Sequence, residues 1–349
     1  MNSKNILLVL TGGTICSFAD ENNERSSDVK RAERLIIEKF HSSTSPFSSE
    51  RCVKFHAEAP LNVLSENMSI ENWNILIDAL KKYDYSAYDG VIVLHGTDTL
   101  AYTSSLLSIL FAGTKIPVFL VSSALPLTEK ATNGNANFRA AVELILGGIK
   151  PNVYAVYRNY ESNSGESTDT MYIHYGSHLL QCANRSDNFY SKTMTKLEGP
   201  EPRFEAVGMP EKTLPLYACP ELSDSVLRIN PYVGINYERY SLDGVKAVIH
   251  GTYHSSTLAA SAAEVSSATH LLLRCKTHNP PIPMFLEPCN PKAYSYETTG
   301  KILRMGAGAI YGMTSEFSYV KLLLGVCRGL SGEALCEYMM SEINGEFIY

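Results

Sequence analysis

The feature that most constrains this chain is the stretch from Val91 to Thr103, in which an apolar run leads directly into His-Gly-Thr-Asp-Thr at residues 95–99. Large and β-branched apolar residues without alternation are typical of a strand that is buried in a parallel sheet. Gly96 permits a tight exit from that strand, and the amphipathic run from Leu100 to Phe111 predicts a helix directly after it. The stretch therefore predicts a strand–turn–helix unit of an α/β fold.

The carboxyl end of such a strand is where open α/β sheets bind ligands. Thr97, Asp98 and Thr99 place hydroxyl and carboxylate groups there, at the start of the predicted helix. These residue types cap helices by accepting hydrogen bonds from free N–H groups. They are also the parts of a hydrolytic site, which needs a hydroxyl nucleophile, a carboxylate and a helix N-terminus. The stretch alone leaves both interpretations open.

A second strand end of the same kind lies near the start of the chain. Ile6 to Leu10 predicts a buried strand, and Thr-Gly-Gly-Thr at residues 11–14 follows at once. The two glycines let the backbone turn sharply and approach a ligand closely. The sequence lacks G-x-G-x-x-G and Gly-Lys-Ser/Thr, so it does not indicate a phosphate-binding loop. It presents Thr14 as a further hydroxyl at a strand end.

Strands and helices alternate from residue 5 to about residue 160, which predicts an α/β fold with a doubly wound, mostly parallel sheet. We expect a larger N-terminal domain at 1–204, a proline-rich linker at 205–223 and a smaller C-terminal α/β domain at 224–349. We also expect an irregular segment at 158–225 and a polar, lid-like loop at 17–31. In the second domain, the expected strands are Val226–Ile229, Val245–His250, His270–Leu273 and Met284–Leu286, and the expected helices are Ser256–Ser267, Phe317–Leu324 and Gly332–Ile343.

Charge and hydropathy exclude several functional classes. The net charge is −6 and no basic block is present, so nucleic acid is not an expected partner. No apolar run approaches the ~20 residues of a membrane span, and the first residues do not form a signal-peptide pattern. The eight cysteines are scattered without C-x-x-C spacing, which is typical of reduced thiols. We therefore expect a cytoplasmic protein that does not bind membranes.

Two histidine pairs have the i, i+4 spacing that can face a metal on a helix, His174 with His178 and His250 with His254. Neither pair is followed by a third ligand or by a glutamate base in the zincin pattern. Structural roles fit these histidines better, so we expect no metal and no cofactor. His95 precedes the glycine of the central motif and is expected to be a supporting hydrogen-bonding residue, not a base.

Together, the two strand ends resemble the signature segments of a known family. Thr-Gly-Gly-Thr-Ile at 11–15 and His-Gly-Thr-Asp-Thr-Leu at 95–100 are similar to the two signatures of the bacterial-type L-asparaginases. Ser-Glu-Asn-Met at 65–68 lies where the family has Ser-Gln/Ser-Asp-Met, and the length and two-domain layout resemble the cytoplasmic type I branch. The resemblance implies an amidohydrolase that converts L-asparagine to L-aspartate and ammonia and assembles as a homodimer or homotetramer.

The resemblance also implies roles for single residues. Thr14 would be the nucleophile that attacks the side-chain amide, and Thr97 would activate water or the attacking hydroxyl. Asp98 would hold the ammonium of the substrate. Ser65 and Glu66 would bind its α-carboxylate and α-amine. The remaining expected substrate-binding residues are Gly13, Gly96 and Ala124, with main-chain groups near Ala124 and Thr97 as oxyanion donors.

Two parts of the family pattern are missing. Residues 15–30 contain no tyrosine that could contact the first threonine, and Phe18 is their only aromatic residue. Counting back from Phe189 places Leu180 where the family has a catalytic lysine. Loss of a general base typically costs ~10²–10⁴-fold in rate. Two alternatives to asparagine hydrolysis therefore remain: a catalytically weak protein that binds or senses a small amino acid, and an amidase that acts on a larger amide.

Overall fold

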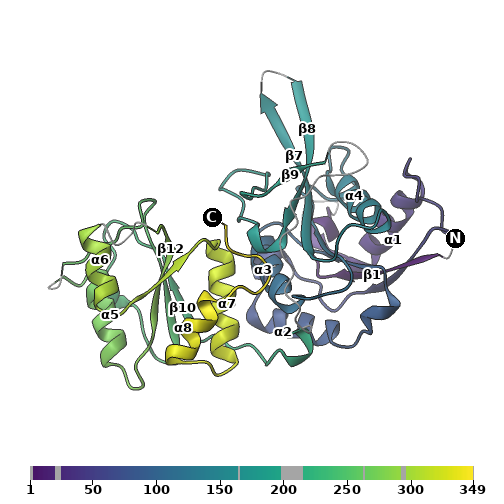
Figure 1. Ribbon diagram of the computed structural model, residues 1–349. Coiled ribbons are helices and arrows are strands. Elements are labelled where there is room, and N and C mark those ends of the chain that lie inside the picture. Colours follow the sequence, from purple (N-terminus) through teal and green to yellow (C-terminus); the bar gives the residue numbers. More distant parts are fainter. Residues whose placement is uncertain are drawn as a thin grey trace. The chain divides into compact units, whose positions relative to one another are not determined.

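The computed structural model describes residues 3–19, 25–163, 166–197, 215–261, 264–291 and 296–348. The chain divides into two compact units, which we call unit 1 (Met1–Ala218) and unit 2 (Cys219–Tyr349) (Figure 1). Both are α/β units, and the larger, mostly parallel sheet belongs to unit 1, as the sequence predicted. Residues 205–214 of the expected linker lie outside the described residues.

Unit 1 is built on a seven-stranded sheet with the order β4-β1-β5-β6-β7-β8-β9. The first five strands in this order are parallel, whereas β8 and β9 are antiparallel additions at one edge. The strands are β1 (Lys4–Leu10), β4 (Val53–Glu58), β5 (Gly90–Leu94), β6 (Val118–Val121), β7 (Val153–Asn163), β8 (Glu166–Tyr175) and β9 (Thr195–Lys196), and the helices are α1 (Val29–His41), α2 (Ile70–Leu80), α3 (Leu100–Leu110) and α4 (Gly134–Leu146).

Both faces of the central strands are buried, which explains their continuous apolar sequences. Leu8 of β1 and Ile92 of β5 lie in a core cluster with residues of α1 and α4, including Ile36 and Phe138. The neighbouring residue Val93 points to the opposite face and is also fully buried. Burial of each such side chain contributes about 1.5–3 kcal/mol, so the ends of these strands are rigidly placed.

Unit 2 contains a four-stranded parallel sheet whose order, β10-β11-β12-β13, follows the chain. Helix α7 packs on β10, β11 and β12, while residues of α5 and α6 belong to a second core cluster. The strands are β10 (Val226–Ile229), β11 (Ala247–Gly251), β12 (Met284–Cys289) and β13 (Gly308–Tyr311), and the helices are α5 (Ala268–Thr277), α6 (Glu297–Arg304), α7 (Ser315–Cys327) and α8 (Gly332–Met340).

The predicted irregular segment at 158–225 is wrong in its first part. Strand β7 continues to Asn163, and β8 returns beside it as a long antiparallel hairpin (Figure 1). Antiparallel strands at a sheet edge alternate polar and apolar residues, and this mixed pattern hides them from a search for apolar runs. The expected loop at 17–31 is also partly wrong. It contains the antiparallel pair β2 (Ser17–Ala19) and β3 (Arg25–Ser27), and α1 begins within it at Val29.

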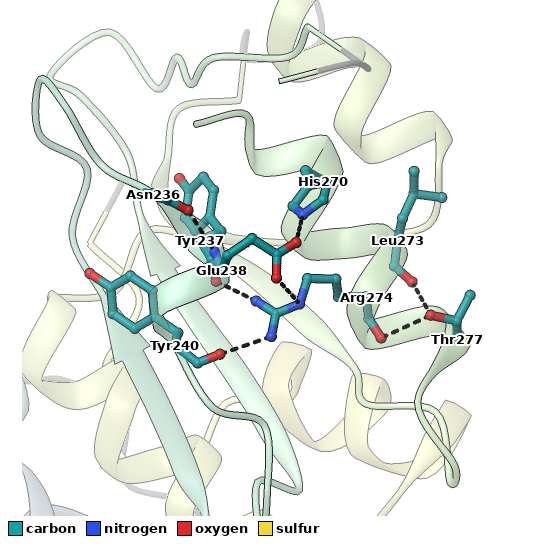
Figure 2. A network of polar contacts seen from close by, with 8 residues as sticks. All are labelled: Asn236, Tyr237, Glu238, Tyr240, His270, Leu273, Arg274 and Thr277. Atoms are coloured by element: carbon teal, nitrogen blue, oxygen red, sulfur yellow. Dashed lines mark hydrogen bonds and ion pairs between the residues drawn. The ribbon is translucent and has the colours of Figure 1, made fainter. Parts of the chain in front are cut away.

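Two predictions in unit 2 are wrong. His270–Leu273 lies in helix α5 and not in a strand, because a short apolar run does not distinguish the two. Figure 2 shows what the polar face of this helix does: the Arg274 guanidinium donates to the Tyr240 carbonyl at 2.9 Å, and His270 Nε2 lies 2.5 Å from Glu238. The predicted helix Ser256–Ser267 is absent from the described residues of that range, while α6 and β13 were not predicted.

Candidate active site

The carboxyl ends of β1, β5 and β6 are aligned at one edge of the unit 1 sheet. Leu10 pairs with Leu94, and Leu94 pairs with Val121. Thr14 and Thr97 follow β1 and β5 within a few residues, so the register brings the two predicted threonines to the same edge. Both are partly exposed. This edge is where parallel sheets bind ligands.

Two glycines let the loops after β1 and β5 touch. Gly13 has φ 78°, and a Cβ atom built on it would lie 2.2 Å from the Gly96 Cα. A Cβ atom on Gly96 would lie 2.4 Å from the Ser65 hydroxyl oxygen. Neither position therefore accepts a side chain without moving the backbone. Because Thr14 and Thr97 directly follow these glycines, the contact fixes the two threonines on adjoining backbone segments.

Asp98 is held by Ser65, the first residue of a short 3₁₀ segment (Ser65–Asn67). The Ser65 hydroxyl donates to Asp98 Oδ2 at 2.7 Å and accepts from the Asp98 N–H at 3.2 Å. Thr99 donates its hydroxyl to the Ser65 carbonyl at 2.9 Å, so it does not cap α3 through its side chain. Ser65 is buried, whereas Asp98 and the neighbouring Glu66 are exposed. At this helix start, the side chains of Asp98 and Thr99 thus bind Ser65 and do not cap α3.

The two main-chain donors expected from the sequence differ in availability. The Ala124 N–H donates to Asn133 Oδ1 at 3.0 Å, and Asn133 Nδ2 in turn donates to the Arg158 carbonyl. Ala124 is therefore able to offer a ligand its carbonyl oxygen, but its N–H is already bound. In contrast, no acceptor for the Thr97 N–H is found among the residues that the structure describes.

His95 is fully buried beneath this edge, where sequence reasoning placed a supporting residue. Its Nδ1 lies 2.8 Å from the Gly96 carbonyl oxygen, and its Nε2 lies 2.9 Å from the Thr103 hydroxyl. Burial lowers the pKa of His95 to about 4, so the imidazole is neutral at pH 7. A buried histidine with both nitrogens bound to protein groups supports the site and does not act as its base.

Leu180, which the count from Phe189 placed at the position of the family's lysine, is exposed. The two residues after it approach the Asp98 segment. The Gln181 amide donates to the Asp98 carbonyl, and the pKa of the Cys182 thiol is raised to about 12 by burial and by the charges of Asp187 and Asp98. The sequence did not indicate Gln181 as a site residue, although the count from Phe189 had singled out the preceding residue, Leu180.

Phe18 does not take the place of the missing lid tyrosine. Its ring is buried in the core cluster of unit 1, and the Arg31 guanidinium lies 4.1 Å from the ring centroid. Residues 20–24 of the expected lid lie outside the described residues.

The histidine pairs do not form helical metal sites. His174 lies in β8, His178 in a 3₁₀ turn and His250 in β11, so the helical spacing that suggested a metal does not exist. Within the described part of the chain, no group of three metal-binding side chains is found. No helix in the described ranges is long and apolar enough to cross a bilayer.

The fold is that of the asparaginases. The thermostable L-asparaginase from Thermococcus kodakarensis superposes with a TM-score of 0.75 and 21% identity, covering 99% of each chain. L-asparaginase I from Vibrio cholerae superposes with a TM-score of 0.74, also at 21% identity, and covers 99% of this chain and 100% of that one. At this level of identity the similarity establishes the fold alone.

Sequence comparison adds the family. The model of the asparaginase N-terminal domain matches residues 5–197, which is more than half of the chain. An L-asparaginase of Thermococcus kodakarensis is 28% identical over 97% of this chain and 98% of its own length. A subunit of the glutamyl-tRNA(Gln) amidotransferase of Methanococcus maripaludis is 29% identical over 70% of this chain and 58% of its own length. The chain belongs to the asparaginase family, whose members are amidohydrolases.

Proposed function

We propose that this protein hydrolyses the side-chain amide of L-asparagine to L-aspartate and ammonia, with Thr14 as the nucleophile. The observation that carries the proposal is the contact between Gly13 and Gly96, which holds Thr14 and Thr97 on touching backbone segments. The asparaginases among the relatives support asparagine as the first substrate to test.

The reaction begins when the Thr14 hydroxyl oxygen attacks the amide carbon and its proton passes through Thr97 toward the leaving nitrogen. A threonine hydroxyl is a weak nucleophile at its ordinary pKa and needs such a proton acceptor. The Thr97 N–H is available to bind the negative oxygen of the tetrahedral intermediate. Ammonia then leaves, and water hydrolyses the ester on Thr14 to release aspartate.

The amino-acid end of the substrate is assigned to Ser65, Glu66 and Asp98. Asp98 is an exposed carboxylate whose Oδ2 already accepts a hydrogen bond from Ser65. A substrate ammonium at this carboxylate forms a charge-assisted hydrogen bond. The Ser65 and Glu66 side chains are assigned to the α-carboxylate and α-amine; because Ser65 has one hydroxyl proton and donates it to Asp98, its hydroxyl must exchange that bond to donate to the α-carboxylate. Because the Ala124 N–H is bound to Asn133, we assign its carbonyl, and not its N–H, to the amide nitrogen of the substrate.

A second candidate function is hydrolysis of a larger amide. The count from Phe189 puts Leu180, and not a lysine, at this point of the family pattern, and Gln181 beside it contacts Asp98. Both observations favour chemistry that differs from that of a typical asparaginase. Relatives named as subunits of the glutamyl-tRNA(Gln) amidotransferase are a precedent for a larger substrate within the family. The net charge of −6 argues against tRNA itself. The exposed Leu180 and the contact of Gln181 with Asp98 also suit a weak enzyme that mainly binds or senses a small amino acid.

Ammonia release from L-asparagine, L-glutamine and an asparagine-containing peptide separates these candidates. We expect the fastest release from L-asparagine and none above background from a Thr14→Ala/Thr97→Ala control. Preference for the peptide would favour the larger-amide function. Binding of L-asparagine without release above the control would support the sensing protein and overturn the proposed hydrolysis.

We further propose that the protein acts in the cytoplasm as a homodimer or homotetramer, as implied by its family. Light scattering at micromolar concentration measures the mass directly. A monomer at that concentration would contradict the assembly.

A further inference from the structure

Three buried side chains form a chain of hydrogen bonds beneath the Gly96–Thr97 peptide. The Trp73 indole N–H lies 3.1 Å from the Thr103 hydroxyl, which lies 2.9 Å from His95 Nε2. His95 Nδ1 lies 2.8 Å from the Gly96 carbonyl oxygen. His95 and Thr103 have no exposed surface and Trp73 has 5%. We call Trp73, Thr103 and His95 the indole–imidazole relay.

The chemistry of these groups fixes the direction of every hydrogen bond in the relay. The Gly96 carbonyl only accepts, so His95 carries its proton on Nδ1 and donates there. The imidazole is neutral at pH 7, so Nε2 accepts and the Thr103 hydroxyl donates to it. The Trp73 N–H only donates, and the Thr103 oxygen accepts it through a remaining lone pair. The relay therefore holds His95 in a single tautomer and orientation.

This orientation determines where the Thr97 N–H points. The C=O of Gly96 and the N–H of Thr97 belong to the same planar peptide group and point in opposite directions when that group is trans. Since His95 binds the carbonyl from inside the core, the N–H is directed away from the core at the edge of the sheet. Among the described residues it meets no acceptor.

We propose that His95 is a positioning residue that aims the Thr97 N–H at the oxyanion of the tetrahedral intermediate, and that Thr103 and Trp73 lock it in place. The inference rests on the proposed amide hydrolysis. It adds a role for three residues that do not touch the substrate. Donors aimed in advance at developing charge lower the barrier most, because no reorganisation is needed during the reaction.

Asn and Gln variants of His95 separate the two ends of the imidazole. The Asn side-chain nitrogen is attached to Cγ, as Nδ1 is, and can still donate to Gly96. The Gln amide reaches the position of Nε2 and can accept from Thr103, but it leaves the Gly96 carbonyl without its donor. We expect His95→Gln to lower kcat on the order of 10–100-fold, less than the ~10²–10³-fold loss for outright removal of an oxyanion donor. We expect KM to stay within about threefold, because the oxyanion exists only near the transition state.

His250 in unit 2 supplies a matched control. Its Nδ1 lies 2.6 Å from the Gly251 carbonyl and its Nε2 lies 2.8 Å from the Tyr237 hydroxyl, and it is equally buried. The next N–H, that of Thr252, already donates to the Glu287 carbonyl at 2.9 Å. His250→Gln should therefore lower the melting temperature about as much as His95→Gln without lowering kcat.

Variants of Thr103 keep the test decisive if His95→Gln fails to fold. Thr103→Val removes the hydroxyl at nearly constant volume, and we expect a smaller loss of kcat, about 3–10-fold, with rescue by Thr103→Ser. The ¹⁵N signals of His95 should show a proton on Nδ1 and none on Nε2 in the wild type. In Thr103→Val the proton should stay on Nδ1, because the Gly96 carbonyl still accepts it, while the Nε2 signal shifts because its hydrogen-bond donor is lost. Unlike turnover, these signals report the hydrogen bond between Thr103 and His95 Nε2 directly.

The outcomes are distinct. A loss of kcat in His95→Gln that is clearly larger than in His95→Asn, with retention in His250→Gln, supports the inference. Equal kcat in all three variants and the wild type overturns it and leaves the proposed hydrolysis intact. A wild type that releases no more ammonia than the Thr14→Ala/Thr97→Ala control overturns the proposed hydrolysis, and the catalytic role of the relay with it.

Discussion

The same tripeptide, a buried histidine followed by glycine and threonine, directly follows strand β5 of unit 1 and begins within the last residues of strand β11 of unit 2. In both, the histidine Nδ1 binds the glycine carbonyl and Nε2 binds a hydroxyl group. The units differ in what happens to the threonine. The Thr97 N–H is open among the described residues, whereas Thr252 donates its N–H to Glu287 and its hydroxyl to Pro288.

The neighbouring strand causes this difference. In unit 2, β12 runs to Cys289, and its pairing with β11 includes the Gly251–Glu287 pair, so the ladder continues through Thr252. In unit 1, β6 ends at Val121, and the last ladder bond is the one from the His95 N–H. The strand end in unit 1 is therefore open because β6 stops level with β5, whereas the one in unit 2 is closed because β12 runs past the end of β11. Identical local sequence does not make two identical sites.

Removal of the threonine hydroxyls should have the largest effect and separate the two units. We expect Thr14→Ala to reduce turnover by on the order of 10⁴–10⁶-fold and Thr97→Ala by ~10²–10⁴-fold, since each removes a reacting group. Thr252→Ala should leave turnover unchanged and cost about 1 kcal/mol of stability through the lost bond to Pro288. Steady-state ammonia release and melting temperature are measured on all three. Lost stability with unchanged turnover in Thr97→Ala would show that Thr97 has no catalytic role.

Buried charge in unit 2 is structural, and its loss should have the next largest effect. Lys321 Nζ lies 2.7 Å from Glu346 Oε1, and both side chains have no exposed surface. Glu346 also accepts from the Ile343 and Asn344 N–H groups. Lys321→Met leaves the carboxylate unpaired, and we expect a loss of about 3–5 kcal/mol in the free energy of unfolding.

Denaturant titration measures this effect, and the double variant Lys321→Met/Glu346→Gln is its control. Either single change leaves one buried charge unpaired, whereas the double variant removes both charges, so it should cost less than Lys321→Met alone. An equal or larger cost in the double variant would contradict the assignment of the penalty to unpaired charge.

The exposed charge of unit 1 should contribute to binding and not to stability. Asp98→Asn keeps the hydrogen bond from Ser65 but removes the negative charge. We expect weaker binding of L-aspartate or L-asparagine by about 1.5–3 kcal/mol, which is roughly 10–150-fold in Kd, with little change in melting temperature. Calorimetric titration gives the Kd. Unchanged affinity would remove Asp98 from the ammonium site.

The two buried histidines should contribute alike to the pH dependence of stability. Burial lowers the pKa of both His95 and His250 to about 4 from an ordinary value of 6.5. Between these values the unfolded chain binds protons that the folded chain does not, so stability is present above pH 6.5 and falls as the pH falls toward 4. Each histidine contributes a slope of up to about 1.4 kcal/mol per pH unit. His95→Asn and His250→Asn should flatten the curve of unfolding free energy against pH by similar amounts. Flattening by only one of them would contradict the expectation that the two histidines contribute equally to this pH dependence.

The sequence by itself determined the elements that local pattern controls. The apolar runs of β1 and β5 predicted strands buried on both faces, and the glycines after them predicted tight exits from these strands. The structure adds that the two exits touch at Gly13 and Gly96. The resemblance of these ends to the asparaginase signatures identified the family, which the comparison over residues 5–197 established. Ser65, more than 30 residues from Asp98, was named from that resemblance, and the structure brings the two within hydrogen-bond distance.

Only the tertiary structure decided which polar groups are free. The approach of Gln181 to Asp98 and the closure of Thr252 by Glu287 depend on partners that are distant in sequence, and the pairing of Ala124 with Asn133 depends on how the loop between them folds. The hairpin of β7 and β8 was missed for the same reason, because its strands are stabilised by each other and not by a continuous apolar pattern. Local sequence places a polar His-Gly-Thr segment at the end of an apolar strand, but the length of the neighbouring strand decides whether that segment is available for chemistry.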